Sequence, residues 1–225
     1  MEAHALVSKL FDKNIRFPFL TLLISGGHCL VAVCENVEKF LILGNTIDIA
    51  PGNFIDKISR KIDNYEIDYI EKNLSGGALI ELRAANGDPE SYPHMIQQVE
   101  TYCKHNKNCD FSFSGFFSSM NRLIDRTIKH DNPLCKKTLS NLSATTQHLL
   151  LIQFEDRLKR AFLFCKYKNI EINDVVVAGG VASNLYIKQN LEKLCNKFRL
   201  NLSIPPIEYC TDNGVMIGWN GLLVS

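Results

Sequence analysis

The stretch DVVVAGGVASN, which ends at Asn184, carries an apolar run, two glycines and the polar start of an expected helix. Gly179 and Gly180 have no Cβ, so a ligand can approach the backbone closely at these positions. Ser183 or Asn184 can cap the helix that begins near Leu185, and a helix N-terminus presents N–H donors suited to an anion. The glycines could equally serve to let a strand turn into a helix. The segment alone does not decide between a ligand site and a simple connection.

The elements around this segment predict an α/β protein. Val175–Val177 are β-branched without polar alternation, which is typical of a strand buried on both faces, as in parallel sheets. Apolar runs at 19–25, 29–34 and 39–44 are joined by short turns and predict an antiparallel three-stranded meander. The apolar residues of 50–62 share one face of a helix.

The remaining chain predicts mostly helices. We expect a short helix over SGGALIELRAANGD, a loop over PESYPHM with its two prolines, and a short strand, a Ser-Gly turn and a helix over CDFSFSGFFSSMNRLIDRTI. A long amphipathic helix is expected from Thr138 to about Tyr167. After the strand of the opening segment we expect a helix at about 185–198, a strand over RLNLSI and a last helix that begins near Asn213.

This order of elements is that of one half of the actin-like or sugar-kinase-like (ASKHA) ATPase fold, in which a three-stranded meander and two β-α units form a five-stranded sheet. We therefore expect residues 1–18 to be a remnant of the N-terminal half. Residues 19–225 are expected to form the C-terminal half, with a helical insertion at about 63–168.

Composition narrows the classes of protein. Of 225 residues, 46% are hydrophobic, which suits a real core, and 25 Lys and Arg against 24 Asp and Glu leave any nucleic-acid surface to a local patch. The eight cysteines form no C-x-x-C pair, which favours reduced, buried thiols in an intracellular protein over a disulfide framework or a zinc ribbon. No apolar stretch approaches the roughly 20 residues of a membrane span, and no signal or transit peptide is visible.

Four stretches together closely resemble the tRNA N6-adenosine threonylcarbamoyltransferase family, formerly described as O-sialoglycoprotein endopeptidase-like. They are TLLISGGH (21–28), LGNTIDIAPGNFIDKISRKI (43–62), CDFSFSGF (109–116) with VVVAGGVASN (175–184), and YCTDNGVMIGWNG (209–221). The resemblance runs from residue 1 to about residue 221. The sequences IDIAPGNFIDK and SGGALIE are most similar to the mitochondrial branch of the family, so a mitochondrial location is expected.

The resemblance implies a group transfer to tRNA. The family moves the threonylcarbamoyl group of threonylcarbamoyl-AMP onto N6 of the adenosine 3′ of the anticodon (position 37) in tRNAs that read codons starting with A, and AMP leaves. Because the exocyclic amine is a poor nucleophile, such a site must polarise the carbonyl group and stabilise the leaving phosphate. The implied partners are threonylcarbamoyl-AMP, tRNA and a second copy of the chain in a homodimer, without a membrane.

The substrate-binding residues that the resemblance implies come from five segments: Leu23, Ile24, Ser25, Gly26, Gly27, Asp56, Gly77, Glu81, Ser183, Asn184 and Thr211. The turn at 23–27 would bind the phosphate and acyl groups through backbone N–H groups. Asp56 would hold the ribose hydroxyls, and Gly77 with Glu81 would close over the nucleoside. Residues 183–184 would contact the nucleotide, and the preceding glycine pair would let adenosine lie against the backbone. No catalytic residue is implied.

The resemblance also implies one divalent metal ion per subunit, zinc or iron. The family holds it with two histidines of an H-x-x-x-H helix, which share a helix face, and an aspartate near the C-terminus. His4 matches the second histidine and Asp212 the aspartate, while the first histidine would precede Met1. Catalytic sites usually have three protein ligands. The chain is therefore expected to be a C-terminal fragment, an alternative product or a gene model started at an internal methionine, and to be inactive or poorly folded alone.

Several residues have a simpler alternative. Asp56 could be an exposed charge on an amphipathic helix, and Asp212 could be the N-cap of the last helix. His28 is expected to be packed or to lie behind the ligands rather than to bind metal. The remaining histidines show no mutual metal spacing: His94, His105, His130 and His148.

Other functions stay open. A non-catalytic interaction module of the same family would explain the missing histidine. A small-molecule kinase of the same fold is disfavoured by SGGH and FSFSG, and a metalloprotease by the absence of an H-E-x-x-H helix. For tRNA the candidate surfaces are three basic clusters: Arg122/Arg126/Lys129, Lys136/Lys137 and Arg157/Lys159/Arg160.

Overall fold

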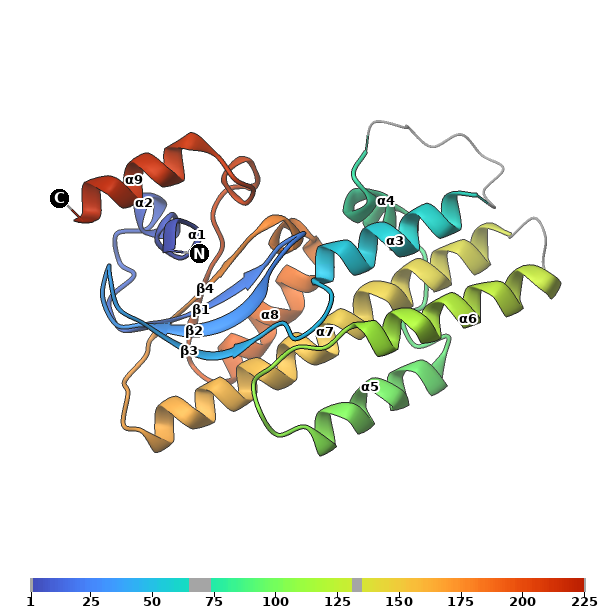
Figure 1. Cartoon of the computed structure of the whole chain (residues 1–225), viewed down its shortest axis with the longest axis horizontal. Coiled ribbons are helices and arrows are strands. Elements are labelled where there is room, and N and C mark those ends of the chain that lie inside the picture. The colour runs from blue at the N-terminus through green and yellow to red at the C-terminus, as the bar shows by residue number, and fades with distance from the viewer. Residues whose placement is uncertain (1, 65–73, 131–134, 225) are drawn as a thin grey trace.

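A single mixed sheet forms the centre of the molecule (Figure 1). The computed structural model describes residues 2–64, 74–130 and 135–224. The strand order is β3-β2-β1-β4-β5. The strands are β1 (Phe19–Ile24), β2 (Cys29–Cys34), β3 (Phe40–Asn45), β4 (Asp174–Ala178) and β5 (Asn201–Ser203). β1, β2 and β3 pair antiparallel, whereas β4 lies parallel to both β1 and β5. The predicted meander and the predicted parallel strand are confirmed.

Helices cover both faces of this sheet, so the middle strands are buried throughout. Every residue of β1, β2 and β4 is buried. One face is covered by α1 (Glu2–Leu6), α2 (Ser8–Phe11) and α9 (Gly214–Val224), and the other by α7 (Lys136–Tyr167) and α8 (Leu185–Lys197), as Figure 1 shows. Strands covered on two sides need no polar alternation. The α/β class is confirmed, and so is the expected five-stranded sheet built from a three-stranded meander and two β-α units.

Four further helices lie beside this layer: α3 (Pro51–Asp63), α4 (Gly76–Ala84), α5 (Pro93–His105) and α6 (Ser114–His130). α3 buries Phe54, Ile58 and Ile62 on one face, as its periodicity predicts. α4 begins after Ser75, whose hydroxyl accepts the N–H of Ala78. Two short 3-10 turns, η1 (Gly180–Ser183) and η2 (Ile207–Tyr209), lie near the ends of β4 and β5.

Three predictions of secondary structure in the helical region were wrong in detail. The expected loop PESYPHM contains the start of α5, because Pro93 occupies the first helical turn, where its missing N–H costs nothing. The expected strand before α6 is reduced to a single bridge between Phe111 and Thr46. Ser114 and the glycine after it are the first turn of α6 rather than a separate turn.

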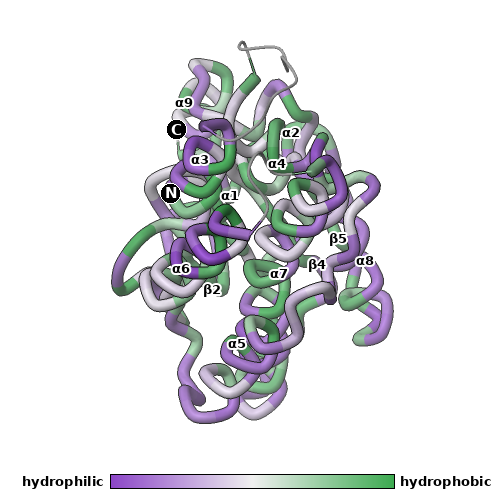
Figure 2. Tube along the Cα trace, turned by 90° about the vertical axis from the view of Figure 1, so that its right-hand side faces the viewer, coloured by the Kyte–Doolittle hydropathy of each residue, from purple (hydrophilic) through white to green (hydrophobic). Residues whose placement is uncertain are grey.

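The long helix α7 is confirmed in its bounds but is not amphipathic along its whole length. Residues 142–147 are buried without interruption, so all sides of the helix are covered there. Figure 2 places α7 in the middle of the other helices. Periodic apolar residues predict a helix with one solvent-exposed face. Where α7 is packed on every side, no face is exposed and the sequence does not alternate between apolar and polar faces.

The first helices are tied to the last one. Ala3 and Val7 pack against Met216, and the indole Nε1 of Trp219 donates to the carbonyl oxygen of Leu6 at 3.0 Å. The boundary at residue 18 stays a prediction. All eight cysteines lie in the described ranges and are free, as expected, but the expectation of burial is wrong for Cys135, which is exposed, and for Cys109, which is partly buried. None of the helices in these ranges combines the length and hydrophobicity that crossing a bilayer requires.

Candidate functional site

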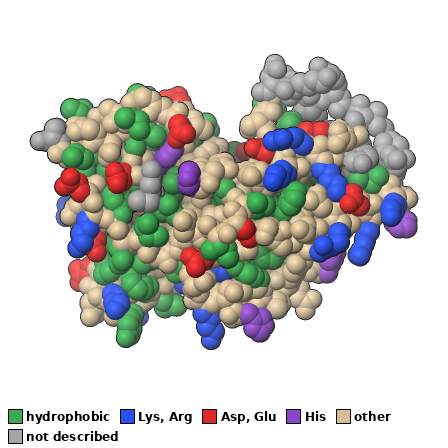
Figure 3. All heavy atoms as spheres, viewed as in Figure 1, with side chains coloured by type: hydrophobic (Ala, Val, Ile, Leu, Met, Phe, Trp, Pro, Cys, Tyr) green, Lys and Arg blue, Asp and Glu red, His purple; other side chains and the backbone are tan. Residues whose placement is uncertain are grey.

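A cavity of about 290 Å³ lies where β1, β4, α3 and α4 come together. Seven of the residues implied by the family resemblance line it: Gly26, Asp56, Gly77, Glu81, Ser183, Asn184 and Thr211. Its walls also contain apolar side chains from α3, η1 and η2, namely Ile55, Val181 and Ile207. We call this the first cavity. Figure 3 shows the molecule hollowed between the side that carries α9 and the side that carries α3 and α4.

A second cavity of about 450 Å³ adjoins the first. Its lining contains the turn after β1 and both expected metal ligands: Leu23, Ser25, Gly26, Gly27, His28, His4, Thr211 and Asp212. The two cavities share Gly26, Gly180, Cys210 and Thr211. Of the implied residues, Ile24 lines neither cavity, since its side chain is buried in the core. The structure thus brings segments from residue 4 to residue 212 around one divided hollow.

The turn after β1 is held by its own serine. The Ser25 hydroxyl accepts the N–H groups of Gly27 (3.3 Å) and His28 (3.0 Å) and lies 3.2 Å from the carbonyl oxygen of His28, to which it can donate. These two N–H groups are therefore not free for an anion. The N–H of Gly26 has no acceptor within the described ranges. α3 packs closely here, because a Cβ on Gly52 would lie 2.7 Å from the Gly26 Cα.

Gly179 and Gly180, which follow β4, have different structural roles. Gly179 has φ +99°, and a Cβ on it would lie 2.4 Å from the carbonyl oxygen of Ile24. This glycine lets β4 end against β1 and lines neither cavity. Gly180 lines both cavities, and a Cβ there would make only an ordinary contact at 3.5 Å with Thr211. The close approach to backbone expected for a ligand is therefore available at Gly180.

The N-terminus of α8 is capped twice at the cavity wall. The Asn184 Oδ1 accepts the N–H of Ile187 at 3.0 Å, and the Glu81 Oε1 accepts the N–H of Leu185 at 2.7 Å. The Asn184 Nδ2 donates to the Oε1 of Gln147 on α7 at 3.1 Å, and both of these side chains are buried. Sequence reasoning missed Gln147. Gln147 stands in the polar stretch TTQH (145–148), before the apolar run begins at Leu149, so no local signal marked it.

Asp56 is half-buried in the first cavity rather than a solvated charge. The start of α4 packs against it, since a Cβ on Gly76 would lie 2.4 Å from the Asp56 Oδ1. A carboxylate at the wall of a partly apolar cavity can accept hydrogen bonds from sugar hydroxyls while the apolar walls contact a planar base. Gly77 lies within the first turn of α4 rather than in a loop.

The expected metal ligands meet at the second cavity. The His4 Nε2 lies 2.8 Å from the Asp212 Oδ1; the His4 side chain is 12% exposed and that of Asp212 is 99% exposed. Asn213, not Asp212, caps α9, because its Oδ1 accepts the N–H of Met216 at 2.9 Å. His28 is exposed at the cavity rather than packed.

No group of three metal-ligating side chains occurs within the described ranges. The expected metal site therefore has two side chains of this chain, His4 and Asp212, and the His4 Nδ1 is buried without a hydrogen-bond partner. Cys210 lies at the boundary between the two cavities, and its thiol donates to the carbonyl oxygen of Pro205 at 3.4 Å. Burial raises the pKa of its thiol, although Lys188 opposes the shift, so the thiol stays protonated at neutral pH.

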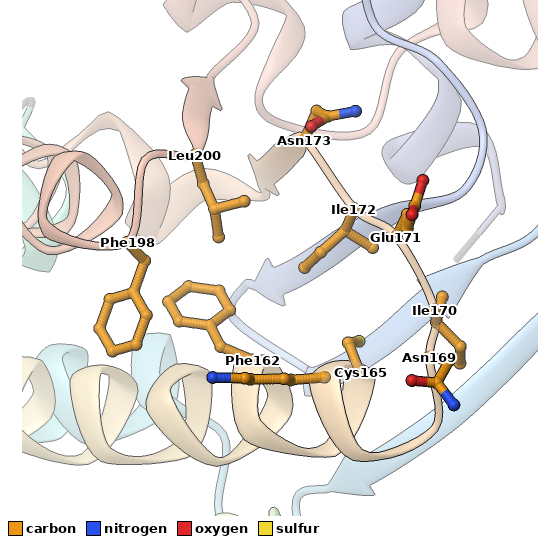
Figure 4. A pocket seen from close by; sticks show the side chains of 10 residues that line it. Phe162, Cys165, Asn169, Ile170, Glu171, Ile172, Asn173, Phe198 and Leu200 are labelled. Carbon is orange, nitrogen blue, oxygen red and sulfur yellow. The ribbon is translucent and has the colours of Figure 1, made fainter.

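A third cavity, of about 450 Å³, contains none of the implied residues. It lies between the C-terminal end of α7 and the connection from α8 to β5. In Figure 4, Phe162, Ile172 and Leu200 point toward its interior, whereas Glu171 points away. It is separate from the divided hollow described above.

Comparisons with known proteins place the chain in one family. The model of the tRNA N6-adenosine threonylcarbamoyltransferase family matches residues 1–219. The mitochondrial tRNA N6-adenosine threonylcarbamoyltransferase of Homo sapiens is 42% identical over 229 residues, which cover 99% of this chain and 53% of the human protein. The enzyme of the same name from Wolbachia of Brugia malayi is 36% identical over 222 residues, which cover 99% of this chain and 60% of the relative.

Among solved structures, full-length HypF in its phosphate- and nucleotide-bound form is similar over 100% of this chain and 42% of that chain, with 18% identity and a TM-score of 0.48. The chain spans about half the length of the mitochondrial relative and somewhat more of the bacterial one. The family model, however, covers nearly every residue from first to last. The chain therefore belongs to the tRNA N6-adenosine threonylcarbamoyltransferase family.

Proposed function

We propose that this protein takes part in the transfer of the threonylcarbamoyl group from threonylcarbamoyl-AMP to N6 of the adenosine 3′ of the tRNA anticodon. The observation that supports it best is the divided hollow. Residues of five separate segments, which the family resemblance implies for substrate binding, line two adjoining cavities. One cavity combines carboxylates with apolar walls and the other contains the turn after β1.

The first cavity suits the nucleoside of the adenylate. Asp56 supplies oxygen acceptors for ribose hydroxyls, and Gly180 allows the base or sugar to approach the backbone. The second cavity then receives the phosphate and the threonylcarbamoyl group, with the Gly26 N–H as a donor. In the reaction the N6 amine forms a bond to the carbamoyl carbon, the bond from that carbon to the phosphate oxygen breaks, and the amine loses a proton.

A divalent metal ion would be held in part by His4 and Asp212. An imidazole nitrogen and a carboxylate oxygen are donors that zinc and iron accept, and the two lie side by side at the second cavity. Such an ion would supply Lewis-acid polarisation of an acyl or phosphoryl oxygen. The fit is partial, since these two side chains are fewer than the three protein ligands that catalytic sites usually have.

Because the metal fit is partial, a second function is also considered, that of a non-catalytic module that binds adenylate or RNA. A non-catalytic module should bind adenylate or RNA without transferring the threonylcarbamoyl group. The transferase should both bind and transfer.

One experiment separates the two. The chain is incubated with threonylcarbamoyl-AMP, a divalent metal and unmodified tRNA, the tRNA is digested, and threonylcarbamoyladenosine is quantified by mass spectrometry. Product above an Asp56→Ala control supports the transferase. Absence of product with retained AMP binding supports the module, and absence of both contradicts the proposed function.

The location and the assembly also stay proposals. Similarity to mitochondrial relatives supports a mitochondrial location, although bacterial relatives are similar as well. The expected homodimer is testable by analytical ultracentrifugation at several protein concentrations.

A further inference from the structure

Five exposed cationic side chains lie on two neighbouring helices beside the first cavity. They are Lys57 and Arg60 on α3 and Arg122, Arg126 and Lys129 on α6. The two helices pack against each other, and Figure 3 shows Lys and Arg gathered over this side of the molecule. We call these five residues the α3–α6 basic face. Sequence reasoning found its α6 half alone, because the α3 half lies far away in the chain.

The acidic groups on these two helices do not neutralise the basic face. Asp125 pairs with Lys61 at 2.7 Å, and Asp63 pairs with Arg83. Within the described ranges, Lys57, Arg60, Arg126 and Lys129 have no acidic partner. A surplus of exposed positive charge on one surface attracts polyanions.

The other two basic clusters are less suited to bind phosphates. Arg157 is fully buried, with its Nε donating to the carbonyl oxygen of Asp110 at 2.8 Å. Lys159 pairs with Glu155 and Arg160 with Asp156. In the remaining cluster, the Lys137 Nζ donates to the carbonyl oxygen of Asn86 at 3.2 Å. The charges of the cluster on α7 at 157–160 are thus already paired or buried.

The basic face continues from the cavity. Ile55 and Asp56 of α3 line the first cavity, and Lys57 and Arg60 follow on the exposed side of the same helix. Since a helix rises about 1.5 Å per residue, Arg60 lies roughly 6 Å beyond Asp56 along the axis. A strand whose phosphates contact this face therefore runs past the rim of the hollow.

We propose that the α3–α6 basic face binds the phosphate backbone of the RNA whose adenosine is modified. This inference rests on the proposed function and adds the surface on which the RNA lies. The contacts are electrostatic, so they contribute affinity that falls with salt and little base specificity.

The test compares two matched double variants. Lys57→Gln with Lys129→Gln removes two charges from the basic face, and Lys193→Gln with Lys197→Gln removes two from exposed positions of α8. The probe is an RNA anticodon stem-loop with adenosine 3′ of its anticodon, measured by fluorescence anisotropy over a series of salt concentrations. For the basic-face variant we expect Kd to rise about 10-fold at low salt and the slope of log K against log salt to fall by roughly 1 to 2. For the α8 variant we expect a change within about twofold.

Titration of AMP into the same proteins separates this proposal from the proposed function. Equal losses in both variants, unchanged RNA binding in the basic-face variant, or no RNA binding by the unaltered chain would overturn the basic face. Failure of the unaltered chain to bind AMP would count against the proposed function. The basic face would still be tested by the comparison of RNA binding between the two double variants.

Discussion

The carboxylate of Glu81 on α4 accepts the backbone N–H of Leu185, the first residue of α8, at 2.7 Å between Oε1 and N. The two residues are far apart in the chain, and their bond holds Glu81, which lines the first cavity, against the start of α8. A carboxylate at a helix N-terminus satisfies an N–H group that has no partner in the helix and interacts favourably with the helix dipole. Glu81 therefore shapes the cavity even before a ligand arrives.

Replacing Glu81 with alanine should lower both stability and ligand binding. We expect the free energy of unfolding to fall by about 1 kcal/mol, as for loss of an N-cap, and AMP binding to weaken. Urea denaturation and calorimetry measure the two effects. Glu192→Ala, at an exposed position of α8, is the control. If Glu81→Ala behaves as this control does in both assays, the contact has no role in the cavity.

Asn184 and Gln147 should be coupled. The Asn184 amide is oriented by its bonds to Ile187 and Gln147, so either single change disturbs the same bond. We expect Asn184→Ala to cost about 1 kcal/mol of stability through the lost cap, and Gln147→Leu to cost less in the Asn184→Ala background than alone. A double-mutant cycle by urea denaturation measures the coupling. Strict additivity would show that the two side chains act independently.

The adjacent glycines should respond differently to replacement by alanine. Gly179→Ala forces a side chain into φ +99° and against the Ile24 carbonyl oxygen, so we expect a loss of at least about 1 to 3 kcal/mol. Gly180→Ala meets Thr211 at an ordinary distance and should leave stability nearly unchanged, while reducing AMP affinity. Melting temperatures and calorimetry on the two variants provide the comparison. A stable Gly179→Ala protein would contradict the described end of β4.

His148 should make the protein less stable in mild acid. Burial lowers the pKa of His148 from 6.5, although Glu90, Glu155 and Glu100 oppose this, and its Nδ1 bonds the Tyr186 hydroxyl at 2.8 Å. The unfolded chain therefore takes up the proton at higher pH than the folded protein does. Stability should fall as the pH drops from about 7 through 6.5 toward the folded pKa, and this contribution should level off below it.

The measurement for His148 is the urea midpoint between pH 7.5 and 5, in steps of roughly half a unit near the unfolded pKa. His148→Gln should flatten the decline over this range. His94→Gln, which changes an exposed histidine of α5, should retain it. An identical decline in all three proteins would assign the pH dependence to other groups.

Much of the fold is readable from local patterns. Unbroken β-branched runs predicted buried strands such as β4, and the periodicity of α3 predicted its buried face, because each pattern reports burial directly. α5 was missed because prolines were interpreted as loop signals, whereas Pro93 begins a helix. The burial of α7 on all sides at residues 142–147 was missed because it depends on neighbours that are distant in the chain.

The site residues were named from sequence motifs. Their arrangement in space could not be predicted in this way. That Gly26 and Thr211 line both cavities depends on how β1 and β4 end together. The bond from Gln147 to Asn184 joins α7 to α8 across 37 positions and leaves no local trace in the sequence. The motif TLLISGGH (21–28) also gave no sign that the Ser25 hydroxyl already accepts the N–H groups of Gly27 and His28.

The most direct test of the central claim is isothermal titration calorimetry of AMP with the unaltered chain and with Asp56→Ala. The claim is that the first cavity binds an adenylate through the Asp56 carboxylate. We expect one AMP per chain, and at least about 10-fold weaker binding in Asp56→Ala, equivalent to about 1.4 kcal/mol. An absence of binding by the unaltered chain, or equal affinity in the two proteins, would contradict the claim.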